Sequence, residues 1–174
     1  MNYNTSYFFD ILKGMRKFSF KSRSLENSEM DWNYKGIGNT KVVTEIFSDG
    51  YKIYYYDEIF IENYYDEDRN FILKDRKMWY MNKNELVFYH FRNNRYERIL
   101  EFVFIDNKFV LRESYECGSD IYSGDVQFFD YGFYFSIKIK GKKKDELIEY
   151  TYYLDNCSWR KRIDLIIYML CIHI

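Results

Sequence analysis

Residues Tyr115 to Asp145 read YECGSDIYSGDVQFFDYGFYFSIKIKGKKKD, and this stretch decides the fold. Two strand-like runs flank a turn at Asp130-Tyr131-Gly132, and polar, turn-forming signatures lie at the outer ends of both runs. Strands joined by so short a turn must run antiparallel. The stretch therefore predicts a β-hairpin, although it does not by itself indicate a chemistry.

The same pattern extends along most of the chain. Ser48-Asp49-Gly50 separates alternating runs at Val42–Phe47 and Tyr51–Ile61, which is a strong hairpin signal. The polar stretch Ser22–Asn39 reads as a long loop or a weak edge strand. Further strand-like runs are Phe18–Lys21, Phe71–Leu73, Met78–Met81, Leu86–Phe91, Arg98–Ile105, Phe109–Tyr115, Asp125–Phe129, Phe133–Lys140 and Glu146–Leu154.

These runs amount to roughly nine or ten strands, joined almost entirely by turns too short to hold a crossover helix. A long antiparallel meander exposes two edges unless it closes on itself. The sequence therefore predicts an all-β protein, an antiparallel up-and-down β-barrel in which the first and last strands meet. A two-sheet sandwich is the alternative.

One short helix is expected before the strands, because apolar residues there recur at helical spacing and Gly14 can end the segment. It would carry Phe8, Phe9 and Leu12 to the core or to a barrel mouth. We expect residues 1–154 to form one barrel domain. The tail, residues 155–174, is expected to pack on the barrel or to bind a membrane surface or a protein partner.

Composition narrows the function classes. The net charge of −1 gives no overall field that would attract nucleic acid. Three widely spaced cysteines and two histidines argue against a structural zinc site, and we expect reduced thiols and a cytoplasmic location. No signal-peptide pattern opens the chain, and the longest apolar run, Leu165–Ile174, is too short to span a bilayer. No cofactor or metal is expected.

Aromatic residues make up 22% of the chain, with 20 Tyr and 16 Phe but no Pro. Tyr and Phe are read from AT-rich codons and Pro from GC-rich ones, so a skewed genome explains much of this bias. The functional alternative is a tyrosine-lined pocket. In both cases the bias favours strands.

Several short motifs, taken in order, resemble a family of small calycin-like, lipocalin-like β-barrel domains that is known only as a domain of unknown function. The strongest match is Cys117, Asp120 and Tyr122, which resembles the family pattern H-x-C-x-x-D-x-Y. Gly141, Lys144 and Asp145 resemble its G-P-x-K-D turn. Weaker similarities are Phe9, Leu12 and Gly14 at the start, then Gly36, Gly38, Tyr56, Glu58, Arg76–Tyr80 and Leu86–Phe88.

The chain departs from the family pattern at four places. Tyr115 stands where the family has His, Lys142 where it has Pro, and Arg16 where it has Trp; the Arg that closes the last strand is missing near Leu154. The resemblance implies a lipocalin-like barrel over about Tyr7 to Tyr153, and it implies no activity.

The motif residues have simple structural interpretations. Cys117 lacks a neighbouring base to form a thiolate, so we interpret it as a structural cysteine at a strand end. Asp120 and Tyr122 are expected to stabilise a turn, with the rim of a ligand site as the alternative. Lys144 and Asp145, beside Gly141, are expected to form a solvated hairpin tip or to pair with nearby charges, with binding of a phosphate as the alternative.

The preferred hypothesis is a non-enzymatic barrel that binds a small, largely apolar molecule. The residues expected to contact it are Tyr54, Tyr56, Phe88, Phe102, Tyr115, Phe135 and Tyr150, with Glu58, Arg98 and Glu113 as polar orienting groups. One alternative is a filled barrel that serves as an interaction or structural module. A second alternative is an enzyme that uses a carboxylate such as Glu113 with a Tyr as an acid–base pair.

Overall fold

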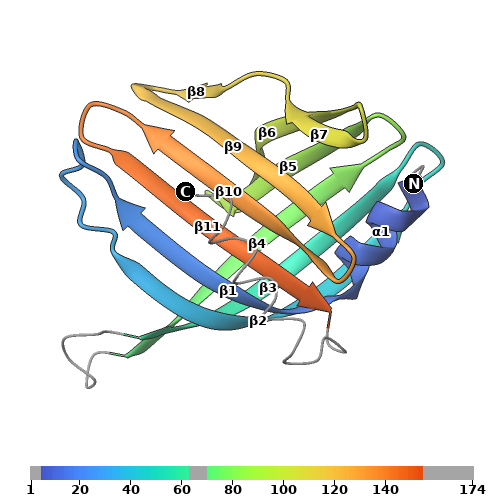
Figure 1. Ribbon diagram of the computed structural model, residues 1–174, viewed down its shortest axis with the longest axis horizontal. Helices are drawn as coiled ribbons and strands as arrows, with labels where there is room; N and C mark the ends of the chain where they lie inside the picture. Colours follow the sequence, from blue (N-terminus) through green and yellow to red (C-terminus); the bar gives the residue numbers. More distant parts are fainter. Residues whose placement is uncertain (1–4, 63–69, 155–174) are drawn as a thin grey trace.

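A computed structural model describes residues 5–62 and 70–154. The tail, which was predicted to pack on the barrel or to bind a partner, lies outside these residues. One helix, α1 (Thr5–Gly14), precedes a single antiparallel sheet of eleven strands (Figure 1). The strands are β1 (Met15–Ser24), β2 (Tyr34–Ile46), β3 (Tyr51–Glu62), β4 (Phe71–Met81), β5 (Glu85–Arg92), β6 (Arg95–Ile105), β7 (Lys108–Leu111), β8 (Tyr115–Cys117), β9 (Asp120–Phe129), β10 (Gly132–Lys140) and β11 (Asp145–Leu154).

The sheet is curled into a half-barrel, with the strand order β7-β6-β5-β4-β3-β2-β1-β11-β10-β9-β8 (Figure 1). The first and last strands meet, since Phe18 and Phe20 of β1 pair with Tyr152 and Tyr150 of β11. The prediction of an all-β antiparallel barrel with a short N-terminal helix is confirmed. The strands form one continuous sheet and not the two-sheet sandwich that was the alternative prediction.

The gap in the barrel lies where β7 faces β9, and we call this gap the seam. The two strands lie side by side, yet no backbone ladder joins them within the described part of the chain. Side chains close the seam instead. Gly124 of β9 lies so close to β6 that a Cβ there would come within 2.6 Å of Leu100 Cδ1.

Glycines explain one difference from the predicted strands. β1 continues to Ser24 and β2 begins at Tyr34, so most of the predicted loop Ser22–Asn39 is strand. Gly36 and Gly38 suggested a loop, but they are in β2 because other atoms occupy the space that a side chain would need. A Cβ at Gly38 would lie 2.2 Å from the Phe18 ring. Other boundaries also differ: β4 is one strand over Phe71–Met81, the run Phe109–Tyr115 is divided between β7 and β8, and β9 begins at Asp120.

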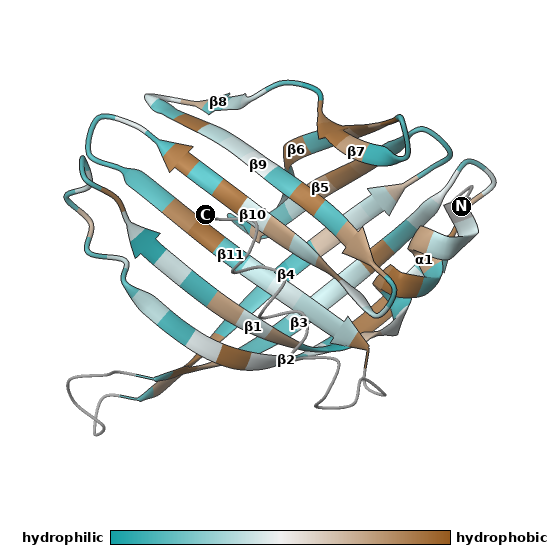
Figure 2. Cartoon of the chain, in the orientation of Figure 1, coloured by the Kyte–Doolittle hydropathy of each residue, from teal (hydrophilic) through white to brown (hydrophobic). Residues whose placement is uncertain are grey.

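Alternation along the strands separates an inner face from an outer face, as the hydrophobic and hydrophilic bands in Figure 2 show. In β3 the buried residues are the odd-numbered ones from Ile53 to Ile61. The inner face is filled largely by aromatic rings: Trp79 packs edge-on against Phe133 and Phe135, and Phe133 stacks on Tyr152. This core fills the middle of the barrel.

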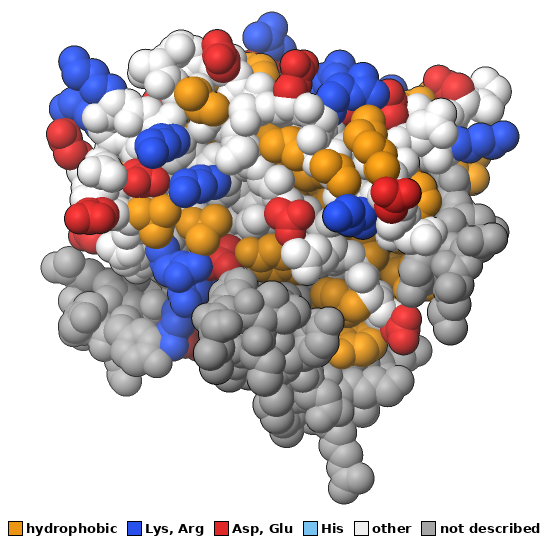
Figure 3. All heavy atoms as spheres, turned by 45° about the horizontal axis from the view of Figure 1, so that its top comes forward, with side chains coloured by type: hydrophobic (Ala, Val, Ile, Leu, Met, Phe, Trp, Pro, Cys, Tyr) orange, Lys and Arg blue, Asp and Glu red, His pale blue; other side chains and the backbone are white. Residues whose placement is uncertain are grey.

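The outer face carries charged and hydrophobic side chains together. On the side shown in Figure 3, Lys and Arg are interspersed with Asp, Glu and hydrophobic side chains. Ile37, Phe60 and Ile72 are exposed hydrophobic residues that lie opposite one another on β2, β3 and β4.

The helix α1 packs at one end of the barrel (Figure 1). Its buried residues include Phe8 and Leu12, while Phe9 is half-buried and stacks on Tyr51 at a centroid distance of 4.0 Å. The Tyr55 hydroxyl donates a 2.6 Å hydrogen bond to the Leu12 carbonyl. The predicted helix and its apolar anchor residues are therefore confirmed, and α1 covers the end where β3 begins.

Candidate functional site

A cavity of about 490 Å³ lies at the other end of the barrel. Its lining includes Leu73 of β4, which pairs with Ile59 far along β3, whereas α1 meets the start of β3 at Tyr51. Most of the wall is apolar: Phe20, Trp32, Tyr34, Leu73, Phe88, Ile99, Tyr122, Ile137, Ile139, Ile148 and Tyr150. The polar lining residues are Ser22, Lys74, Asp75, Lys77, His90 and Arg92.

Lys77 carries a buried charge at this cavity, with a side chain only 1% exposed. Its ammonium donates to Asp57 Oδ2 at 2.5 Å, to Asp75 Oδ2 at 2.8 Å and to the Tyr152 hydroxyl at 3.3 Å. The Tyr152 hydroxyl in turn donates to Asp57 Oδ2 at 2.7 Å. All three ammonium protons therefore have acceptors, and the side chain is held in one position.

Asp75 connects this buried cluster to His90. The two residues lie on neighbouring strands, and His90 Nε2 is 2.8 Å from Asp75 Oδ1. Because an ionised carboxylate only accepts hydrogen bonds, Nε2 must carry the proton. The Asp75 side chain is 15% exposed and that of His90 is 41% exposed, so the chain of polar groups runs from the core to the cavity.

Electrostatic interactions hold Lys77 and Asp75 in their ionised forms. Burial alone would lower the pKa of Lys77, but Asp57 and Asp75 raise it well above its ordinary value. Burial alone would raise the pKa of Asp75, but Lys77 and His90 hold it far below its usual range. Lys77 therefore remains an ammonium, which is a structural cation and not a free nucleophilic amine.

Three buried tyrosines make the fold sensitive to alkali. Burial and the nearby Asp57 raise the pKa values of Tyr55 and Tyr152, and burial also raises the pKa of Tyr150. Since their folded-state pKa values exceed the unfolded value, their contribution to stability is complete below about pH 10 and is lost as the pH rises further. The raised pKa of Lys77 acts in the same direction.

We therefore expect Tyr55, Tyr150 and Tyr152 to ionise only when the protein unfolds at alkaline pH. A titration that follows tyrosinate absorbance and far-ultraviolet circular dichroism together should show surface tyrosines ionising first. A second rise in absorbance should then coincide with loss of the strand signal. Complete tyrosine ionisation with an unchanged circular dichroism spectrum would contradict this prediction.

The rim of the cavity carries a second charged group. Arg92 donates through Nε to Glu97 Oε2, and Arg95 donates to Glu97 Oε1 at 3.0 Å. Arg92 Nη2 also lies 3.8 Å from Cys117 Sγ. Burial alone would lower the pKa of Arg92, but hydrogen bonds to Glu97 and Tyr122 raise it.

The loop between β1 and β2 contributes Trp32 to the cavity wall, and Glu146 fixes this loop. Glu146 is fully buried and accepts hydrogen bonds from the hydroxyls of Ser24 and Ser28. These hydroxyl oxygens accept in turn from the backbone N–H groups of Trp32, at 2.6 Å, and Met30, at 2.9 Å. One carboxylate thus orders the loop that forms one side of the cavity.

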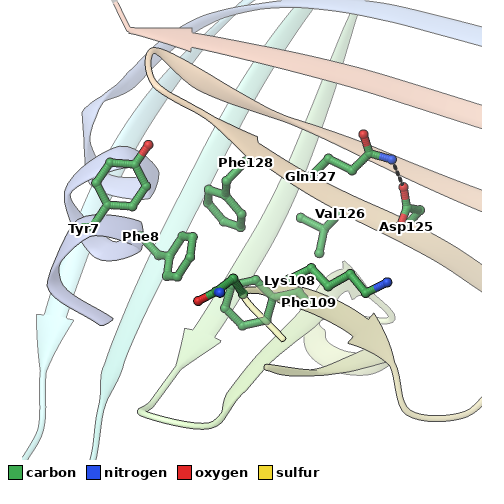
Figure 4. A pocket seen from close by; sticks show the side chains of 9 residues that line it. Tyr7, Phe8, Lys108, Phe109, Asp125, Val126, Gln127 and Phe128 are labelled. Atoms are coloured by element: carbon green, nitrogen blue, oxygen red, sulfur yellow. Dashed lines mark hydrogen bonds between the residues drawn. The ribbon is translucent and has the colours of Figure 1, made fainter. Parts of the chain in front are cut away.

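A second cavity, of about 350 Å³, lies at the seam beside α1 (Figure 4). Phe8, Phe109 and Phe128 form its aromatic wall, and Tyr7, the residue before Phe8 in α1, also lines it. Gln127 Nε2 donates to Asp125 Oδ2 at 2.6 Å on the polar side (Figure 4). This cavity is separate from the charged cluster around Lys77.

The structure places the predicted ligand contacts in different environments. Phe88 and Tyr150 line the larger cavity. Phe102 and Phe135 are buried in the core, and Tyr115 is half-buried with its ring 5.8 Å from that of Tyr122.

The remaining predicted contacts do not line the larger cavity. Tyr54, Tyr56 and Glu58 lie on the outer face of β3, because the odd-numbered residues of this strand face inward. Arg98 is exposed and pairs with Glu101, since an irregularity at Phe88/Tyr89 shifts the register of β5 against β6. Glu113 is exposed between β7 and β8.

The two polar signatures that bracket the β9–β10 hairpin come together in space. Lys144 Nζ lies 2.6 Å from Asp120 Oδ2, and Gly141 approaches Asp120 so closely that a Cβ would clash with Oδ1. Cys117 pairs with Asp120 across β8 and β9, and Tyr122 lines the larger cavity. Asp145 is buried and accepts a hydrogen bond from Asn27 Nδ2 at 3.3 Å. Of the two predictions for Lys144, the structure therefore shows the pairing with a nearby charge, that of Asp120.

Sequence reasoning missed the central charged residues Asp57, Asp75, Lys77 and His90. A signal existed in β3, where Asp57 interrupts the inward series Ile53, Tyr55, Ile59 and Ile61. An acidic residue at a position that alternation marks as buried needs a partner. Lys77 could be recognised as that partner only once the register of β3 against β4 was known.

Comparison of the chain with family models, curated proteins and solved structures found no match. The resemblance to a calycin-like domain family therefore stays a prediction. The described helix is too short to cross a membrane. Within residues 5–62 and 70–154, no group of three or more His, Cys, Asp or Glu side chains is placed to hold a metal ion.

Proposed function

We propose that this protein binds a small, largely apolar molecule in the cavity that contains Asp75 and His90. The observation that carries the proposal is a cavity of about 490 Å³ whose apolar wall ends at a few fixed polar groups. Ligand pockets typically have volumes of roughly 300–1,000 Å³ and this same combination of lining residues. The three cysteines favour a reducing compartment, and the cytoplasm remains our predicted location.

Two features support binding over a purely structural role. The aromatic core fills the middle of the barrel, while the end that contains Ile137, Ile139 and Ile148 stays open enough to form the cavity. The polar groups are also positioned in advance, because Lys77 orders Asp75 and Asp75 orders His90. A site ordered before binding loses less conformational entropy when the ligand arrives.

The enzyme alternative has less support. Glu113, its proposed acid–base residue, is exposed and does not line the cavity. The proposed partner Tyr115 is half-buried and packs against Tyr122. The geometry thus offers no reason to assign an acid–base role to this pair.

A cavity-filling substitution tests the proposal. Ile148→Trp should occupy the cavity and abolish uptake of Nile red, a neutral apolar dye, as measured by its fluorescence. Native mass spectrometry of protein purified from its host should show a small co-purifying molecule in the wild type and none in the variant. Ile37→Trp is the matched control, because Ile37 lies exposed on the outer face of β2. Equal dye uptake by both variants, or no uptake by the wild type, would disprove the proposal.

A further inference from the structure

We propose that the ligand carries one carboxylate group, which binds at the cavity rim to Arg92 and Tyr122. This inference rests on the proposed function and specifies the chemical class of the ligand. Both side chains line the same cavity as the apolar residues Ile99, Ile137 and Ile139. An amphipathic acid would place its apolar body against those residues and its head group at the rim.

The cavity wall offers few hydrogen-bond acceptors to a ligand. Among the lining residues that the structure describes, Asp75 is the only carboxylate, and both its oxygens are already used. Oδ1 faces His90 Nε2 at 2.8 Å and accepts from the Arg76 backbone N–H at 2.8 Å. Oδ2 faces the Lys77 ammonium at 2.8 Å. A ligand amine would have to compete with these partners for Asp75.

Hydrogen-bond donors remain available at the rim. The guanidinium of Arg92 has five N–H groups, and its described contacts to Glu97, Cys117 and Tyr122 do not use all of them. The Tyr122 hydroxyl can accept from Arg92 and donate its own proton to a ligand. His90 adds no donor, because its ring proton is on Nε2 and faces Asp75. A group rich in acceptors therefore fits this rim better than a group rich in donors.

Charge balance at the rim also favours an anion. Glu97 is the carboxylate that both Arg92 and Arg95 contact, so two guanidiniums share one negative charge. Within the residues that the structure describes, neither arginine forms an ion pair with a second carboxylate. A bound carboxylate would supply the missing negative charge, and guanidinium–carboxylate contacts are among the strongest hydrogen bonds in proteins.

Three probes of equal chain length separate the head group from the apolar body: decanoate, decanol and decylamine. Each is titrated against the protein preloaded with Nile red at neutral pH. Decanoate should displace the dye at a concentration roughly tenfold lower than decanol, because the net gain from a charge-assisted hydrogen bond is of that size. Arg92→Gln should remove this advantage while the affinity for decanol stays unchanged.

Arg95→Gln is the matched control, because Arg95 contacts the same Glu97 but is 75% exposed and does not line the cavity. It should keep the preference for decanoate. If Arg92→Gln does not fold, Tyr122→Phe removes one donor from the same rim and should weaken decanoate binding alone. Equal affinity for decanoate and decanol, or tightest binding of decylamine, would overturn the carboxylate assignment and leave the proposed function intact. No displacement by any probe would overturn both.

Discussion

Replacing Lys77 by methionine should lower the free energy of unfolding by about 3–5 kcal/mol, as expected when one partner of a buried ion pair is removed. Methionine has a similar length and can fill the same space, so the loss is electrostatic. Without the ammonium, Asp57 and Asp75 face each other across β3 and β4 with no positive charge between them. Asp57 is fully buried, and its Oδ1 already lacks a hydrogen-bond partner among the described residues. Urea denaturation at neutral pH measures the loss.

Lys74→Met is the matched control for this variant. Lys74 is on the same strand, but its side chain is 77% exposed and pairs with the exposed Glu58 at 3.2 Å. Its replacement should change the free energy of unfolding by less than about 0.5 kcal/mol. Similar losses in the free energy of unfolding for the two variants would show that burial of the Lys77 charge does not cause the destabilisation.

The pH dependence gives the Lys77→Met experiment a second readout. In the wild type the pKa of Asp75 is depressed, so its contribution to stability is present above about pH 4 and is lost as the pH falls further. In the variant the two facing carboxylates favour a shared proton, so acidification should relieve their repulsion. The stability difference between the two proteins should therefore shrink from neutral pH towards about pH 4. A constant difference across this range would contradict the electrostatic explanation.

Local sequence signals were sufficient for the hairpins and the helix. Asp130-Tyr131-Gly132 and Ser48-Asp49-Gly50 mark turns that the structure contains, because turn chemistry depends on a few adjacent residues. The spacing of Phe8 and Leu12 likewise predicted the helix and its buried face.

Long-range pairing was harder to predict. The contact of β1 with β11 joins Phe18 to Tyr152, which are far apart in the sequence, and it follows only from the expectation of closure. The seam between β7 and β9 could not be foreseen, because the short strands β7 and β8 were read as one run. The start of β2 was also missed, because Gly36 and Gly38 suggested a loop. Their close contacts with Phe60 and Phe18 are between strands and cannot be read from the local sequence.

The candidate site depended on choosing the correct face of each strand. In β3 the residues Ile53, Ile59 and Ile61 mark the odd-numbered face as inward, but the aromatic residues Tyr54 and Tyr56 on the opposite face suggested a ligand site there. A shift of one residue along β3 placed the predicted contacts Tyr54, Tyr56 and Glu58 on the outer face. The correct face places Asp57 opposite Asp75, and only then does the need for Lys77 become apparent.

Replacing Phe8 by alanine should lower the free energy of unfolding by about 3–5 kcal/mol, the usual loss for a buried phenylalanine. The Phe8 ring contacts the rings of Phe104, Phe109 and Phe128 at centroid distances of 5.4, 5.0 and 4.8 Å. These three rings come from β6, β7 and β9, which lie on the two sides of the seam. No backbone ladder joins β7 to β9 in the described chain, so Phe8 should strengthen the link that Phe109 and Phe128 make directly, with ring centroids 5.6 Å apart.

Phe9→Ala separates this effect from a general loss of helix packing. Phe9 is the next residue of α1, is half-buried, and stacks on Tyr51 of β3 away from the seam. Its loss should cost about 1 kcal/mol, the scale of one aromatic pair. Amide hydrogen exchange should accelerate selectively in β7 and β9 in Phe8→Ala and remain close to wild type there in Phe9→Ala. If exchange in β7 and β9 is equally slow in both variants, the seam is held by contacts other than Phe8, such as Leu100 against Gly124.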